Sequence, residues 1–136
     1  MYKLVVTPEV YGEIDALAQS NPDAAADALV LLEELSGDQA ELEDLCVTGN
    51  RFQYHPPFEV KRLELAVAQG YNIYILKYRD DLGGLPAYRI LVGYHSQRGT
   101  YYALAFTHRS IAYDQHDVAY RSLRDRYDEC GIPSYR

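Results

Sequence analysis

Apolar and polar positions in the first 37 residues predict one short strand followed by two amphipathic helices. Residues 2–6 (YKLVV) form an apolar run typical of a β-strand. Thr7-Pro8-Glu9 then combines an N-cap residue, a proline at the first helical position and an acid in the first turn. Apolar residues follow at helical spacing: Val10, Ile14 and Leu17.

The second helix begins with the same kind of signal. Asn21-Pro22-Asp23 precedes a new apolar stripe, and Gly37 is typical of a helix end. The stripe contains Ala25, Ala28, Leu29, Leu32 and Leu35. We therefore expect a helical hairpin after the first strand.

The pattern changes to a period of two after Gly70. Residues 71–79, 87–95 and 100–107 are rich in β-branched and aromatic side chains, and the polar segments 80–86 and 96–99 separate them. Strands joined by such short turns predict an antiparallel meander.

A last helix is predicted near the C-terminus. Asp114 is the expected N-cap and Asp117 is expected in the first turn, before a stripe at helical spacing that Gly131 and Pro133 end: His116, Tyr120, Leu123 and Tyr127. The middle of the chain is less regular. Residues 40–45 suit one or two helical turns, and the breakers at 48–50 and 56–57 predict loop. Residues 58–68 fit a strand and a helix about equally.

Length and composition limit the class of protein. The 136 residues, 48% of them hydrophobic and 24% charged, predict one soluble α+β domain over residues 1–136. No apolar run is long enough to span a membrane, and no secretory signal is expected. The two cysteines, Cys46 and Cys130, suggest free thiols in the cytoplasm. The four histidines lack the spacing of a zinc site, so we expect no metal and no cofactor.

Charge is distributed unevenly along the chain. Residues 1–50 hold eleven acids and one base, whereas residues 51–136 hold twelve bases and nine acids. The net charge of −7 argues against a polyanion as partner, but this asymmetry allows the C-terminal half to contact one. A solvated acidic helix pair would give the same distribution.

The bases of the C-terminal half gather at the ends of the predicted strands. Lys77 and Arg79 alternate on the first meander strand and flank the same turn as Arg89, while the third strand ends with His108 and Arg109, before Tyr113. Arginines that hold a phosphate beside a group that exchanges protons could cleave RNA without metal. Ordinary solvated strand-end charges are the alternative interpretation. The fourteen tyrosines likewise suit either sheet packing or stacking on bases.

Three segments of the meander resemble the RelE/ParE superfamily of bacterial type II toxins: residues 74–79 (YILKYR), 87–94 (AYRILVGY) and 103–113 (ALAFTHRSIAY). The resemblance implies a small α+β fold in which a strand and two helices pack on an antiparallel meander. RelE-like members cleave mRNA on the ribosome without metal. ParE-like members share the fold but inhibit gyrase.

The resemblance also implies roles for individual residues. Arg89 and Arg109 correspond to the arginines that stabilise the phosphate, and Tyr113 to the tyrosine that stacks on or protonates the substrate. Lys77 is the candidate catalytic lysine, supplemented by Arg79, and either Lys77 or His108 would be the base. Further RNA contacts are expected from Arg98, Arg121 and Arg124.

The sequence therefore predicts a toxin that cleaves mRNA in the ribosomal A site and inhibits translation. Its partners would be the ribosome with its mRNA and a cognate antitoxin, with which it would form a hetero-oligomer. A ParE-like inhibitor of gyrase and a degenerate or phage-encoded interaction protein remain the alternatives. The acidic net charge, the chain's length and the unmatched segment 37–70 depart from the RelE pattern.

Overall fold

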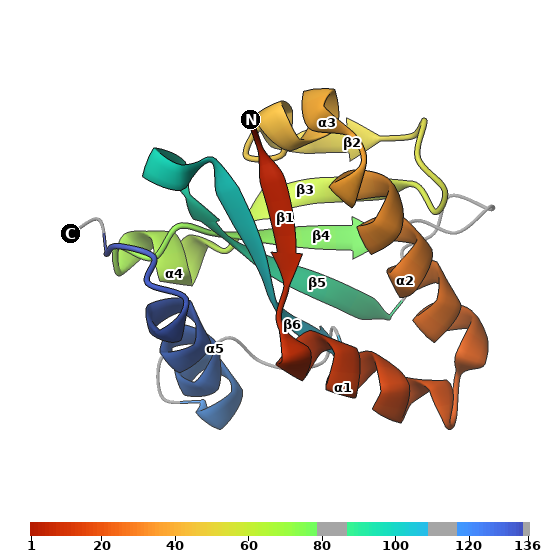
Figure 1. Cartoon of the computed structure of the whole chain (residues 1–136). Helices are drawn as coiled ribbons and strands as arrows, with labels where there is room; N and C mark the ends of the chain where they lie inside the picture. Colours follow the sequence, from red (N-terminus) through yellow and green to blue (C-terminus); the bar gives the residue numbers. More distant parts are fainter. Residues whose placement is uncertain (79–86, 109–116, 135–136) are drawn as a thin grey trace.

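A six-stranded mixed sheet organises the computed structural model, which describes residues 1–78, 87–108 and 117–134. The strand order is β1-β6-β5-β4-β3-β2, and helices pack on both faces (Figure 1). The strands are β1 (Lys3–Val6), β2 (Gly49–Arg51), β3 (Phe58–Arg62), β4 (Ile73–Tyr78), β5 (Tyr88–His95) and β6 (Thr100–His108). The helices are α1 (Pro8–Ala18), α2 (Pro22–Ser36), α3 (Gln39–Asp44), α4 (Glu64–Ala68) and α5 (Val118–Glu129).

The N-terminal strand and helix pair form as predicted, but Leu29, which was expected in the apolar stripe of α2, is exposed, and Leu31 is buried instead. β1 runs parallel to β6, whereas the other neighbouring strands pair antiparallel. The side chain of Asn21 accepts a hydrogen bond from the Ala24 amide and so caps α2. Thr7 occupies the N-cap position of α1, but its hydroxyl donates to the Ala103 carbonyl at 2.8 Å. Thr7 therefore ties the start of α1 to β6 instead of capping the helix.

Polar side chains organise the segment that follows α2. Asp38 caps α3 by accepting from the Glu41 amide, and it also accepts from the Tyr54 hydroxyl at 2.6 Å. Arg51 pairs with Glu41 and donates to the Val47 carbonyl at 2.8 Å. These contacts stabilise β2, so the prediction of loop at residues 48–50 was wrong for Gly49 and Asn50, which belong to this strand.

The undecided segment 58–68 contains both candidate structures, one after the other. β3 extends from Phe58 to Arg62, and the short helix α4 follows from Glu64 to Ala68. The meander β4-β5-β6 then forms as predicted, and the predicted turn 80–86 lies outside the described residues. A β-bulge between Leu91 and Val92 shifts the register of β5 against β6.

The C-terminal helix begins later than the sequence suggested. Asp117 is the N-cap of α5 because its side chain accepts from the Ala119 amide at 2.7 Å, so its predicted place in the first turn was wrong. Asp114 and His116 lie outside the described residues. Tyr120, Leu123 and Tyr127 are buried as predicted.

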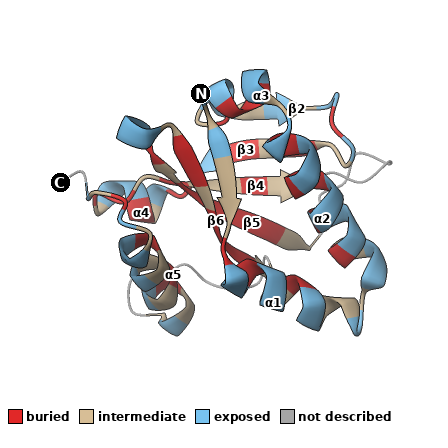
Figure 2. Cartoon of the chain, in the orientation of Figure 1, coloured by how far each residue is buried: buried red, intermediate tan, exposed pale blue. Residues whose placement is uncertain are grey.

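Each face of the sheet has its own hydrophobic core. The first face packs against α1, α2 and α3 through residues such as Val10, Leu31 and Leu76. The second face packs against α4 and α5 through residues such as Ala66, Leu91 and Tyr127. Figure 2 shows buried residues along the strands and exposed ones on the outer sides of the helices. Among the described residues, no helix is long and apolar enough to cross a membrane.

Candidate active site

Four polar side chains form a row across the second face of the sheet. The strand register pairs Glu59 with Lys77, Lys77 with Arg89, and Arg89 with Thr107. Directly paired residues in neighbouring strands project from the same side of a sheet. The row lies on the second face because Leu91, two residues along β5 from Arg89, belongs to the core under α5.

Lys77 is a half-buried amine among other cations. Burial is the largest cause that lowers its pKa, and the charges of Lys61 and Arg89 lower it further. The Glu59 carboxylate acts in the opposite direction. Because the ammonium form is disfavoured, Lys77 is better suited to accept a proton than an exposed lysine would be.

Arg89 places a positive charge at a buried position. Only 8% of its surface is exposed, and its guanidinium donates to the Tyr88 carbonyl at 3.1 Å. A guanidinium that is held in place at low exposure interacts more strongly with a phosphate than a solvated one, because water screens it less. The row therefore places a lysine with a lowered pKa beside a poorly exposed guanidinium on adjacent strands.

An ion pair between α5 and α1 lies next to the row. Arg126 pairs with Glu13 at 3.0 Å and donates to the Leu104 carbonyl at 2.9 Å, while Glu13 accepts from the Phe106 amide at 3.1 Å. β1 pairs with β6 only as far as Ala103. Arg126 and Glu13 provide hydrogen-bond partners for the Leu104 carbonyl and the Phe106 amide, which lie beyond the end of β1. The ion pair, Thr107 and α5 line a small hollow of about 70 Å³.

The other predicted site residues are distributed differently. Arg79, Arg109 and Tyr113 lie outside the described residues. His108 pairs with Tyr88 and packs edge-on against its ring at 5.2 Å, on the first face of the sheet. The row that contains Lys77 and Arg89 therefore does not include His108.

The other predicted arginines that the structure describes do not belong to the row. Arg98 follows β5 at the end opposite to Arg89, roughly 20 Å away at about 3.3 Å per residue. Arg124 lies over the Tyr120 ring at 5.1 Å, and Arg121 is an exposed residue of α5. Of the predicted residues that the structure describes, Lys77 and Arg89 are directly paired on neighbouring strands.

Sequence reasoning missed Glu59, Lys61 and Arg126. Glu59 and Lys61 belong to β3, which the apolar pattern does not identify, so the pattern gives no reason to place them on one face of a strand. Arg126 lies 113 positions from its partner Glu13, and no local pattern indicates such a pair.

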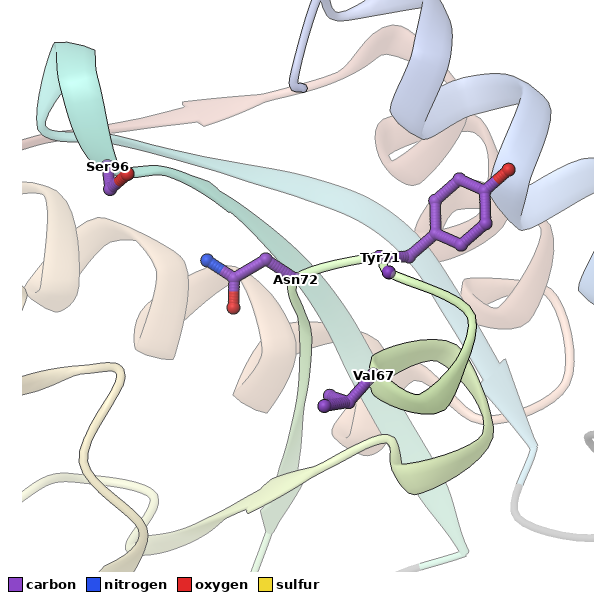
Figure 3. A pocket seen from close by; sticks show the side chains of 5 residues that line it. Val67, Tyr71, Asn72 and Ser96 are labelled. Carbon is purple, nitrogen blue, oxygen red and sulfur yellow. The ribbon is translucent and has the colours of Figure 1, made fainter. Parts of the chain in front are cut away.

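A larger hollow lies elsewhere, between α4 and the ends of β4 and β5 (Figure 3). It measures about 280 Å³ and is lined by Val67, Gly70, Tyr71, Asn72 and Ser96. The polar groups of Asn72 bond within the fold. Its backbone amide donates to the Tyr127 hydroxyl, and its side-chain amide donates to the Tyr94 carbonyl. Asn72 precedes β4, whereas Lys77 lies near the strand's other end, so this hollow is separate from the row.

Comparisons with known proteins found no relative of this chain. No family model, no curated protein and no solved structure matches the chain significantly. In the part of the chain that the structure describes, no group of three histidines, cysteines or carboxylates could hold a metal ion. Fold and geometry define an α+β protein with a row of polar side chains, among them Lys77 and Arg89, on one face of the sheet.

Proposed function

We propose that the protein is a RelE-like toxin, an endoribonuclease that cleaves mRNA on the ribosome. The observation that carries the proposal is the cross-strand pair of Lys77 and Arg89, a lysine with a lowered pKa beside a nearly buried guanidinium. The resemblance of the meander segments to RelE-like toxins supports the same assignment.

The proposed reaction is an intramolecular transesterification. Lys77 takes the proton of a ribose 2′-hydroxyl, and the 2′-oxygen forms a bond to the adjacent phosphorus. The bond from phosphorus to the 5′-oxygen breaks, and that oxygen takes a proton, a role for which Tyr113 is the candidate. The products are a 2′,3′-cyclic phosphate and a 5′-hydroxyl. Arg89 stabilises the negative charge that develops on the phosphate oxygens.

Geometry favours Lys77 over His108 as the base. The two side chains project from opposite faces of the sheet, and Lys77 shares its face with Arg89. A base and a phosphate-binding group must reach the same nucleotide, so they need to share a face.

The proposal includes partners and a cellular setting. A cognate antitoxin would cover the cationic row and form a hetero-oligomer with the toxin in the cytoplasm. The acidic helices α1 and α2 would face away from ribosomal RNA, because like charges repel.

Induced expression in bacteria tests the proposal. Growth should stop, and primer extension on translated messages should show discrete cuts that vanish in an Arg89→Met variant. The net charge of −7 favours the ParE-like alternative, an inhibitor of gyrase without ribonuclease activity. Growth arrest with intact messages would support that alternative, and the absence of both effects would leave only an interaction role.

A further inference from the structure

β1 is an outer strand of the sheet, and only one of its two sides is paired with a strand (Figure 1). On the paired side, the amides of Lys3 and Thr7 donate to carbonyls of the neighbouring segment at 3.1 and 3.3 Å. Alternate residues of a strand direct their N–H and C=O groups to opposite sides. The backbone groups of Leu4 and Val6 therefore point away from β6, along the open edge of the sheet.

A side-chain amide already occupies the first position of this edge. The Tyr2 amide donates to Oε1 of Gln39 at 2.8 Å, and Nε2 of Gln39 donates to the Tyr2 carbonyl at 2.7 Å. A side-chain amide offers the same donor and acceptor as a peptide group, so Gln39 bonds Tyr2 as a neighbouring strand would. The part of the chain that the structure describes provides no such partner for the outward groups of Leu4 and Val6.

An apolar groove lies beside the open part of the edge. It measures about 430 Å³, and Val6 of β1, Tyr11 of α1 and Leu29, Leu32 and Glu33 of α2 contribute to its lining. Tyr11 is 49% exposed and Leu29 is 41% exposed. Neighbouring apolar side chains that stay exposed in this way are typical of an interaction site. A strand added beside β1 would direct every second side chain toward this groove.

Charge indicates which kind of segment fits. The helices α1, α2 and α3, whose residues are all described, contain three, four and three acids and no lysine, arginine or histidine. Glu33 is one of these acids and lines the groove itself. A second copy of this chain would bring the same acidic helices against each other, and like charges repel. A basic segment complements this surface instead.

We propose that the open edge of β1 and the adjoining groove bind an extended basic segment of a partner protein, which adds a strand to the sheet. The backbone of the segment pairs with Leu4 and Val6, and its alternate apolar side chains enter the groove beside Leu29. Its lysine or arginine side chains reach Glu33 and the other acids of the helices. The inference goes beyond the proposed function, because none of these residues belongs to the row on the second face.

A synthetic peptide that alternates valine and lysine is the probe. It is titrated into the whole protein, and amide hydrogen exchange is measured by NMR with and without the peptide. Binding should slow exchange at the Leu4 and Val6 amides by about tenfold, because each gains a hydrogen bond. The Val5 amide faces β6 and is the internal control, so its exchange should change less.

Leu29 and Val30 provide a matched pair of variants. They are neighbours on α2 with exposures of 41% and 42%, but Leu29 lines the groove and Val30 does not. Leu29→Ser should weaken peptide binding by about fivefold or more, because apolar contact is lost. Val30→Ser should stay within about twofold of wild type. Glu33→Gln should weaken binding by about two- to fivefold at low salt.

Four results would overturn the inference. They are the absence of binding up to the solubility limit of the peptide, binding without slower exchange at Leu4 and Val6, equal losses in Leu29→Ser and Val30→Ser, and equal affinity for a peptide with glutamate in place of lysine. Sedimentation of the protein alone adds a fifth. A dimer that protects the same two amides without peptide would assign the edge to a second copy of this chain, against the proposal.

Discussion

Replacing Arg89 with methionine should abolish cleavage while the fold persists. Methionine keeps much of the apolar length of the side chain and removes the guanidinium. At 8% exposure the guanidinium acts in poorly screened surroundings. A unit charge about 5 Å away at an effective dielectric of about 20 is worth about 3 kcal/mol. Loss of one preorganised donor typically costs about 10²–10³ in rate, which agrees with that energy.

Stability should change much less than activity. The variant loses the hydrogen bond to the Tyr88 carbonyl, worth about 1 kcal/mol. It also loses the repulsion between Arg89 and Lys77, worth about 1–3 kcal/mol at neighbouring positions. Because these terms oppose each other, we expect a change of less than about 2 kcal/mol in the free energy of unfolding.

The assay compares single-turnover cleavage of a message on purified ribosomes with urea unfolding of the same preparations. Arg62→Met is the matched control, since Arg62 is exposed and pairs with Tyr74, which packs on the opposite face of the sheet from Arg89. It should retain cleavage within about threefold of wild type, a change of less than about 1 kcal/mol. The reasoning is refuted if Arg89→Met cleaves at the wild-type rate, or if both variants lose activity equally.

Two further predictions concern the fold. Gly93→Ala should destabilise the protein by about 1–3 kcal/mol, because its Cβ would meet three side chains, among them Tyr127 at 3.1 Å. Gly12→Ala in α1 meets no atom within 4 Å and should stabilise by about 0.5–1 kcal/mol; equal effects of the two changes in urea denaturation would contradict this. Tyr54→Phe should cost about 1 kcal/mol at pH 7, because the Tyr54 hydroxyl donates to Asp38 and holds the pKa of that carboxyl below its ordinary value of 3.8. That contribution is fully present above pH 3.8 and is lost as pH falls through the lower folded pKa, so a constant difference in melting temperature down to pH 2 would refute it.

The sequence predicts the meander well because alternation and turn residues are local signals. It does not predict that β1 pairs parallel with β6, a contact between residues about a hundred positions apart. β2 was missed because Gly49 and Asn50 disfavour strands, and the contacts of Arg51 that stabilise β2 are tertiary. Tertiary contacts of this kind override local propensity.

The same distinction applies to the candidate site. Alternation along two predicted strands was sufficient to expect Lys77 and Arg89 near each other. Successive residues of β6 point to opposite faces of the sheet. Because Arg89 pairs with Thr107, the next residue, His108, must lie on the face opposite to Arg89. Glu59 could not be found, since it lies on a strand that the apolar pattern left undecided.

The central claim is ribonuclease activity on the ribosome, and the chemistry of the product ends tests it most directly. Purified protein is added to ribosomes stalled on a defined message, and the RNA ends are identified. The account predicts cuts at the position of the ribosome that carry a 2′,3′-cyclic phosphate and a 5′-hydroxyl. A message that remains intact on these ribosomes, or cuts that leave a 5′-phosphate, would contradict it.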